Sequence, residues 1–264
     1  MRTSQSRYYR AIRSFFRLRR SDELRLVKPF LILETGQPVP SLKRHGGFPH
    51  WIRVAAGLDG REVRTCNVAD GEALPKADDF SGVLITGSGA MVSERLDWSE
   101  RSAEWLRDAA HAGHPMFGIC YGHQLLAHAL GGRVDYNPRG REMGTVSVAL
   151  HAQAGDDALF VDLPTNFDVH TTHLQSVLAL PDEAAVLATS DKDDCQAFRW
   201  RKHVWGVQFH PEFSTVHMRE YIHVRRMALL REGANPQAMR KAVGAAPHAR
   251  QVLKRFVHQA RKRG

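Results

Sequence analysis

Cysteine is scarce and long apolar stretches are missing, and both absences restrict what the chain can be. Its 264 residues include three cysteines, Cys66, Cys120 and Cys195, which are odd in number and widely spaced. That pattern argues against a disulfide framework or a zinc site and is typical of a reducing compartment. No apolar run reaches the roughly 18 residues that a membrane-spanning helix needs. We therefore expect a cytoplasmic protein with no membrane span.

Signatures of bound phosphates and dinucleotides are also missing. A glycine-rich turn follows the apolar run at 82–85, but it lacks the Gly-Lys-Ser/Thr ending of a phosphate-binding loop. No dinucleotide fingerprint occurs, and the five-residue spacing of His123 and His128 does not put them on one helix face. The sequence therefore predicts no cofactor and no metal.

Positive charge is concentrated at the two ends of the chain. The net charge is +9, from 37 Lys and Arg against 28 Asp and Glu. Seven Arg lie in Met1–Arg20 and seven Lys or Arg in Lys241–Gly264, and neither segment contains an acidic residue. The middle of the chain holds the other 23 basic residues and all 28 acidic residues, so its net charge is about −5. We interpret the ends as solvated basic segments, with RNA or an acidic protein as the less favoured alternative.

We divide the chain into a basic N-terminal extension (1–25), a central domain (26–232) and a basic helical tail (233–264). Apolar residues of the extension, from Tyr8 to Phe16, have helical spacing. Its Arg-rich, acid-free composition also resembles a transit peptide. Three explanations of the extension are open: a targeting segment, a helix that docks on the body, or a start codon assigned too far upstream.

Strands and helices alternate through the first half of the central domain. Apolar runs predict strands, and amphipathic runs between them predict helices. In chain order these are a strand at 30–35, a helix near 50–57, strands at 62–68 and 82–88, a helix at 99–113, a strand at 115–119 and a helix at 121–130. This order predicts an α/β fold with a mainly parallel central sheet and helices on both faces.

Beyond Gly132 the pattern changes to short strands with few helices between them. The predicted strands are 145–150, 167–170, 185–189, 197–200 and 204–209. We expect them to add antiparallel strands to the sheet. A covering helix at 215–230 and further helix within 236–263 complete the prediction.

A cysteine lies where a buried strand meets a helix. Cys120 follows the strand at 115–119 and precedes the helix at 121–130. Gly118 and Gly122, two residues to either side, allow the tight turn and close substrate approach of a nucleophile elbow. The positive end of the helix favours thiolate over thiol. The pattern therefore favours a nucleophile over the alternative, a buried structural cysteine.

A histidine and a glutamate end the last predicted strand. His210 and Glu212 lie two residues apart, so on extended backbone their side chains point the same way. Pro211 between them fixes the backbone and stops the strand. Glu212 can hold the tautomer and orientation of His210, which can act as the base for Cys120. We therefore predict a catalytic triad of Cys120, His210 and Glu212.

Three segments resemble motifs of class I, or triad-type, glutamine amidotransferases, and are similar to the glutaminase domain of GMP synthetase. They are Ile85–Ser88, Gly118–Gln124 and Gly206–Glu212, in the order that the family shows. The resemblance spans roughly 29–222 and implies a flavodoxin-like α/β fold. It also implies an enzyme whose cysteine attacks the side-chain amide of glutamine, giving a γ-glutamyl thioester and ammonia. Water then releases glutamate.

The resemblance also assigns residues that surround the triad. An oxyanion needs two backbone N–H donors; Tyr121 follows the nucleophile, and the family match puts the second donor at Ser88, where many members have glycine. By resemblance the substrate-binding residues are Gly87, Gln124, His173, Leu174 and Gln175, and Glu142 supports the site. Leu174 and Gln175 replace the family's usual Gly and Asp, so any role for an acidic side chain there is lost.

No ammonia acceptor is evident in the sequence. About fifty residues follow Glu212, too few for a synthetase domain. We expect that a separate synthetase accepts the ammonia or that none is needed. An alternative with the same triad is hydrolysis of γ-glutamyl peptides or conjugates, which the loops at 44–51 and 135–141 would decide through the size of the leaving group. A binding or regulatory protein on this scaffold is the third hypothesis, against which the intact triad argues.

Overall fold

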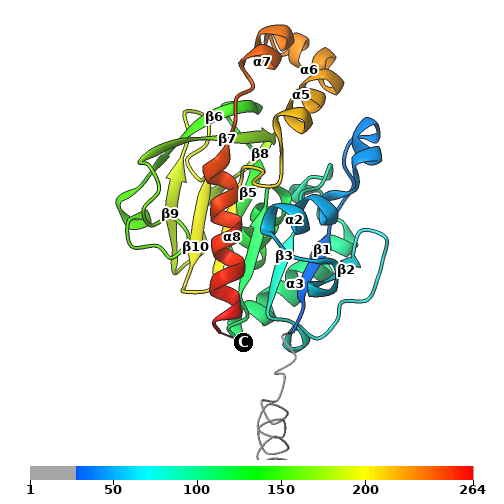
Figure 1. The fold of residues 1–264 in the computed structure, drawn as a ribbon, viewed down its shortest axis with the longest axis vertical. Helices are drawn as coiled ribbons and strands as arrows, with labels where there is room; N and C mark the ends of the chain where they lie inside the picture. Colours follow the sequence, from blue (N-terminus) through cyan, green and yellow to red (C-terminus); the bar gives the residue numbers. More distant parts are fainter. Residues whose placement is uncertain (1–27, 264) are drawn as a thin grey trace, which may run out of the picture.

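A nine-stranded sheet runs through the centre of the computed structural model, which describes residues 28–263 (Figure 1). The strand order is β2-β1-β3-β4-β11-β10-β9-β6-β7, and β5 pairs with β8 in a separate small sheet. The strands are β1 (Phe30–Glu34), β2 (Val63–Asn67), β3 (Gly82–Ile85), β4 (Met116–Ile119), β5 (Arg133–Tyr136), β6 (Glu142–Leu150), β7 (Asn166–His173), β8 (Gln175–Ala179), β9 (Ala184–Thr189), β10 (Ala197–Trp200) and β11 (Val204–Val207). The expectations for the extension at 1–25 lie outside the described residues.

The two halves of the large sheet differ in strand direction. From β2 to β11 neighbouring strands are parallel. From β11 to β7 they are antiparallel. Parallel strands need a crossover between them, usually a helix, whereas antiparallel strands can follow one another through short connections. The predicted α/β fold, with a mainly parallel sheet and antiparallel additions in the second half, is confirmed.

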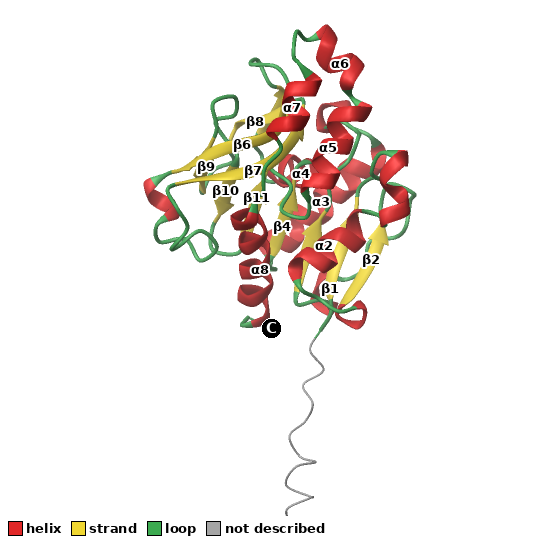
Figure 2. Ribbon diagram, turned by 45° about the horizontal axis from the view of Figure 1, so that its top comes forward, coloured by secondary structure: helices red, strands yellow, loops and turns green. Residues whose placement is uncertain are grey.

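Helices cover both faces of the parallel half. The α-helices are α2 (Phe48–Ala56), α3 (Asp97–His111), α4 (Tyr121–Ala129), α5 (Thr215–Val224), α6 (Arg226–Arg231), α7 (Pro236–Ala242) and α8 (Pro247–Arg261). The short 3₁₀ helices are η1 (Pro40–His45), η2 (Gly60–Glu62), η3 (Ala77–Asp79), η4 (Val92–Glu94) and η5 (Ala152–Ala154). In Figure 2, α2 and α8 lie on one side of the strands. The other side is covered by α3 and α4, whose apolar residues share a second core cluster with the strands.

Alternate residues of each buried strand belong to different cores. Phe30 and Ile32 of β1 pack with α2 and α8, whereas Leu31 and Leu33 pack with α3 and α4. Strands buried on both faces are continuous apolar runs, as β1, β3 and β4 are. Since every residue of these strands meets a covering helix, the strands form a rigid base for the loops at their ends.

The C-terminal part of the chain is helical, in two different settings. Val252, Leu253 and Phe256 of α8 are buried in the same core as β1 and β4, so α8 is one of the layers that cover the sheet. Residues of α5 and α6, which lie near the top of Figure 1, form a separate apolar cluster with residues of η1 and α2. The single helix predicted at 215–230 is wrong: two helices meet at Arg225, whose φ of −90° and ψ of 8° break the helical hydrogen-bond pattern.

Other expectations for the second half of the chain also need correction, among them the strand predicted at 145–150, which begins at Glu142. The sequence did not predict β5 or β8, and β7 is longer than 167–170 because it pairs with β6 over its whole length. The last strand ends at Val207 rather than at residue 209. Among residues 28–263, no helix has the length and apolar character required to cross a membrane.

Candidate active site

Three loops of the sequence motifs meet at one edge of the sheet. The strands β3, β4 and β11 are neighbours and parallel, so their carboxyl ends lie side by side. Gly87 and Ser88 follow β3, Cys120 follows β4, and His210 follows β11. Ligands of open α/β sheets bind outside the carboxyl ends of the strands, so this edge is the candidate site.

The turn at Cys120 is strained and depends on its two glycines. Cys120 has a φ of 52° and a ψ of −100°, outside the conformations that a non-glycine residue usually adopts. A Cβ on Gly118 would clash with the carbonyl oxygen of Gly122, and a Cβ on Gly122 would lie 2.6 Å from that of Ile85. Only glycine fits at either position. Strained backbone of this kind persists only where the surrounding structure holds it, and it gathers at functional sites.

His210 and Glu212 form a buried pair beside the cysteine. Nδ1 of His210 lies 2.8 Å from Oε1 of Glu212, and the two residues are 3% and 2% exposed. The ring of Phe213 stacks on the imidazole at 4.0 Å between centroids and limits its rotation. A Cβ on Gly87 would lie 3.1 Å from Cε1 of His210 and 3.8 Å from Cβ of Cys120, so Gly87 contacts both residues.

The second nitrogen of His210 is available to the thiol. Nε2 of His210 has no full hydrogen-bond partner among the described residues, although the imidazole interacts with Cys120. Catalytic hydrogen bonds are often long in unliganded enzymes and shorten when substrate binds. The geometry therefore allows a proton to pass between His210 and a group at the cysteine.

The charges of this group favour an ion pair of thiolate and imidazolium. Burial opposes ionisation of Cys120, but the positive charge of His210 beside it, with a contribution from His173, outweighs burial and lowers the pKa of the thiol. Burial likewise opposes the charge on His210, but the negative charges of Glu212 and Cys120 outweigh it and raise the pKa of the imidazole. Neither other cysteine shares this environment, since burial raises the pKa of both the Cys66 and the Cys195 thiol.

Ser88 and Tyr121 lie beside Cys120 as the predicted oxyanion donors. Both line a small cavity together with the cysteine. Tyr121 is the first residue of α4, where backbone N–H groups have no partner within the helix. The hydroxyl of Ser88 accepts a hydrogen bond from the backbone N–H of Ala90 at 3.1 Å and lies against Gly36. The side chain that replaces the family's glycine is therefore held within its own loop.

The cavity at Cys120 is small, with a volume of about 30 Å³. The structure brings most of the predicted residues to this cavity. Its lining includes Ser88, Cys120, Tyr121, Gln124, His173, Leu174 and Gln175, and also Met91, Thr172 and Arg225, which the sequence did not indicate.

A second buried histidine–glutamate pair lies beside the cavity. Nε2 of His173 is 3.0 Å from Oε2 of Glu142, and its Nδ1 is 2.9 Å from the backbone carbonyl of Gln175. A carbonyl and a carboxylate both accept, so both ring nitrogens donate and His173 is an imidazolium. Burial opposes this charge, but the hydrogen bond to Glu142 and the nearby negative charges, of which Asp193 is the largest, together outweigh burial and raise the pKa of His173. Glu142, predicted to support the site, is connected to the cavity through His173.

Gln124 is fixed by two hydrogen bonds from its amide nitrogen. Nε2 donates to the backbone carbonyl of Gln175 at 2.7 Å and to Oε1 of Gln208 at 2.9 Å. The amide oxygen is the group of Gln124 that remains to accept a hydrogen bond from a ligand. Gln175 is held in turn, because its Nε2 donates to Oγ of Ser93.

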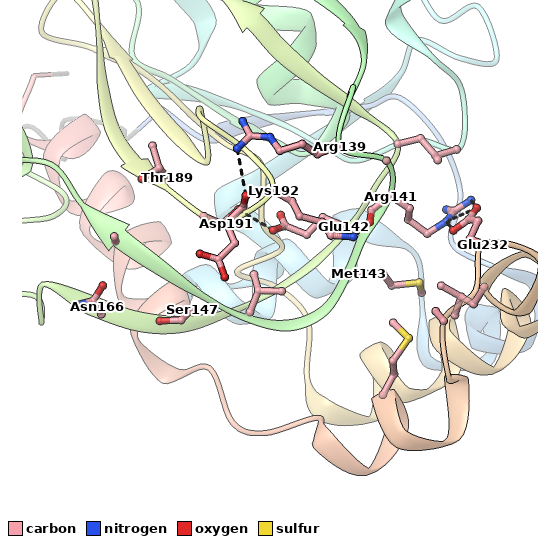
Figure 3. Close-up of a pocket in the computed structure, with 18 residues that line it drawn as sticks. Arg139, Arg141, Glu142, Met143, Ser147, Asn166, Thr189, Asp191, Lys192 and Glu232 are labelled. Carbon is pink, nitrogen blue, oxygen red and sulfur yellow. Dashed lines mark hydrogen bonds and ion pairs between the residues drawn. The ribbon is translucent and has the colours of Figure 1, made fainter.

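A much larger groove of about 880 Å³ adjoins the cavity. Leu174 lines both spaces, and Glu142 lines the groove while it bonds His173. Figure 3 shows charged side chains around the groove, among them Arg141, which pairs with Glu232. The described residues contain no cluster of three His, Cys, Asp or Glu side chains that could hold a metal ion.

Known proteins match both the sequence and the fold. Gamma-glutamyl peptidase 4 of Arabidopsis thaliana is 27% identical over 192 residues, which cover 71% of this chain and 76% of that protein. One subunit of the glutamine-hydrolyzing GMP synthase of Methanopyrus kandleri is 31% identical over 179 residues, 66% of this chain and 88% of that protein. The crystal structure of a glutamine amidotransferase from Thermotoga maritima has a TM-score of 0.70 at 20% identity, and covers 89% of this chain and 99% of that one. At this identity the last match shows the fold alone.

Fold and site together define an α/β protein with a cysteine at a strained strand–helix turn beside a buried histidine–glutamate pair. The family model of the class-I glutamine amidotransferases matches residues 52–226. The chain belongs to this family, as its motifs predicted.

Proposed function

We propose that the protein hydrolyses γ-glutamyl amides through a thioester on Cys120. The observation that carries this proposal is the strained cysteine elbow beside the buried His210–Glu212 pair. A lowered thiol pKa makes the thiolate, which is the nucleophilic form, available near neutral pH. The family match supports the same chemistry for the whole site.

In the first half of the reaction, the thiolate of Cys120 attacks the carbonyl carbon of the side-chain amide. The oxygen becomes an oxyanion that accepts hydrogen bonds from the backbone N–H groups of Tyr121 and Ser88. His210 as imidazolium gives a proton to the amide nitrogen, and the C–N bond breaks. Ammonia leaves from glutamine, or an amine from a conjugate, and a γ-glutamyl thioester remains.

In the second half, water takes the place of the leaving group. Neutral His210 removes a proton from the water while its oxygen attacks the thioester carbonyl, and the C–S bond breaks. Glutamate is released and the thiolate of Cys120 returns beside the imidazolium. Glu212 orients His210 through Nδ1 in both halves. The sum is one amide and one water converted to glutamate and one amine or ammonia.

Two substrate classes are candidates. With glutamine the product is ammonia, for which we propose a separate synthetase as the acceptor, in line with the relative named as a GMP synthase subunit. With γ-glutamyl peptides or conjugates the product is a larger amine; the groove of about 880 Å³ beside the cavity and the relative named as a peptidase support this second function. Three free, buried cysteines support the cytoplasm as its compartment.

The test is to incubate pure protein with glutamine and with γ-glutamyl dipeptides and to measure glutamate, ammonia and free amine. We expect glutamate to form in equal amount to ammonia or amine, and the Cys120→Ala variant to form neither. Faster turnover of the peptides identifies the second function, and slow glutamine turnover that rises with an added synthetase identifies the first. Absence of glutamate from every substrate contradicts the proposal.

A further inference from the structure

Arg225 places a positive charge in the wall of the catalytic cavity. It lies at the break between α5 and α6, and its side chain lines the cavity with Cys120 and Gln124. Two contacts fix the guanidinium: Nη1 donates to Oγ1 of Thr172 at 3.1 Å, and the group lies 5.5 Å from the ring centre of Tyr221. The break in the helix brings this side chain to the cavity.

The guanidinium has no carboxylate partner within the described residues. The nearby Arg141 differs, since it pairs with Glu232. Arg225 forms no such pair between residues 28 and 263, and its one side-chain hydrogen bond goes to a neutral hydroxyl. Burial lowers the pKa of Arg225, with a further lowering from the charge of Arg141. A half-buried cation of this kind gains most from an anionic ligand, because a guanidinium binds a carboxylate through two parallel hydrogen bonds.

The rest of the cavity wall carries no carboxylate to compete with such a ligand, and its negative group is the thiolate of Cys120, the group that attacks the amide. None of the lining residues is Asp or Glu. Glu142 is engaged by His173, and Glu212 lies behind His210. Gln175 replaces the acidic residue that is usual in the family, and its amide nitrogen donates a hydrogen bond to Ser93. The cavity therefore suits a ligand with a negative group beside the reacting amide, and in a γ-glutamyl compound that group is the α-carboxylate.

We propose that Arg225 binds the α-carboxylate of the substrate and makes the enzyme specific for γ-glutamyl compounds in which this carboxylate is free. The inference rests on the proposed function. Thr172 and Tyr221 hold the guanidinium in place, and the carboxylate completes its coordination. Because the α-carboxylate is unchanged during the reaction, Arg225 contributes to binding in the ground state and the transition state alike, so its loss raises KM more than it lowers kcat.

The experiment compares two substrates that differ only at the α-position. γ-Glutamyl-p-nitroanilide carries the free carboxylate, and its α-amide carries a neutral group of similar size. We expect the wild type to prefer the free acid by about 10- to 100-fold in kcat/KM, the range for a charged hydrogen-bonded pair. Arg225→Gln should abolish the preference, mainly through KM. Arg226→Gln, at the exposed neighbouring position, is the matched control and should retain it.

A binding measurement separates failure of this inference from failure of the proposed function. Calorimetric titration of Cys120→Ala protein with glutamine and with glutamine α-amide needs no turnover. We expect tighter binding of glutamine by about 10-fold or more, and loss of that difference when Arg225→Gln is added. Equal binding of both compounds, or an unchanged difference in the double variant, overturns the role of Arg225. Selective binding without hydrolysis of any substrate by the wild type overturns the proposed function instead.

Discussion

Two histidine–glutamate pairs flank Cys120, and they differ in what the second ring nitrogen does. In the first pair, His210 binds Glu212 through Nδ1, and its Nε2 has no full partner among residues 28–263. In the second, His173 binds Glu142 through Nε2, and its Nδ1 donates to a backbone carbonyl. Both histidines are buried and both act on the charge of the cysteine.

This difference suits His210 to transfer a proton and His173 to keep a fixed positive charge. His210 can release and regain a proton at Nε2, because no protein acceptor occupies that nitrogen. His173 cannot release one without leaving an unprotonated ring nitrogen, itself an acceptor, against another acceptor in a buried site, which is costly. Its partner is also held more completely: both oxygens of Glu142 accept hydrogen bonds, from Ser190, Gln196 and His173, whereas Oε2 of Glu212 has none among the described residues. We infer a mobile proton on one side of the thiolate and a fixed positive charge on the other.

Cys120→Ala has the largest expected effect, because it removes the group that both pairs face. Turnover should fall by several orders of magnitude, as is usual when a nucleophile is removed. Thermal unfolding should change little, since alanine keeps the Cβ and the strained turn is already formed. Steady-state rates and circular dichroism check the two statements. Retention of a tenth of wild-type turnover would show that Cys120 is not the nucleophile.

His210→Ala and Glu212→Ala test the first pair. Loss of the base removes proton transfer, a loss of about 100- to 10,000-fold, so His210→Ala should approach the rate of Cys120→Ala. Glu212→Ala only releases the orientation of the imidazole and should be less damaging. Single-turnover rates on a γ-glutamyl substrate rank the variants. The reverse order would mean that the roles are exchanged or that another histidine is the base.

The reactive part of the site could be predicted from the sequence because its order along the chain is simple. Apolar runs marked β3, β4 and β11, and each motif follows one of these strands directly. Parallel neighbours end at the same edge, so Cys120 and His210 had to meet. The need for glycine on both sides of Cys120 was also predictable, and the structure explains it, because a Cβ on Gly118 or Gly122 would clash. The roles of these residues stay predictions until the variants are measured.

The second pair and the cavity wall depend on contacts that sequence patterns do not encode. Glu142 faces His173 through the register of β6 and β7, which turn chemistry and distant packing decide. The small sheet was missed because β5 is largely exposed and has no apolar run. Arg225 reaches the cavity only because α5 ends one residue earlier, at a break that no proline or glycine marks.

His173→Gln tests whether the second pair stores charge. The positive charge of His173 contributes to the lowered pKa of Cys120. Its removal should raise that pKa, so the pH at which the thiol reacts at half its maximal rate should move upward by about one unit. The shift is measured by alkylating Cys120 with iodoacetamide at a series of pH values from about 5 to 10 and following the product by mass spectrometry. This range includes the ordinary pKa of a cysteine, about 8.5.

A double variant separates the charge of His173 from the charge of its partner. His173→Gln alone leaves the buried Glu142 without its positively charged partner, and a negative charge near Cys120 also raises the thiol pKa. The double variant His173→Gln, Glu142→Gln removes both charges, so its midpoint should lie between those of the wild type and the single variant. An unchanged midpoint in both variants would mean that His173 has only a structural role.

Tyr121→Phe has the smallest expected effect on activity and tests whether Tyr121 acts through its backbone alone. Its hydroxyl lies 2.6 Å from Oγ of Ser99 of α3, and both residues are buried. Phenylalanine keeps the backbone N–H proposed for the oxyanion, so kcat/KM should change less than about twofold, below the loss expected for one oxyanion donor. The free energy of unfolding should fall by about 1 kcal/mol, the net value of one buried hydrogen bond. Ser99→Ala breaks the same bond from the other side and should reproduce both results in urea unfolding and steady-state assays. A large loss of kcat in Tyr121→Phe but not in Ser99→Ala would assign the phenol itself a part in the reaction. Tyr121 would then act on Cys120 in addition to the two histidine–glutamate pairs.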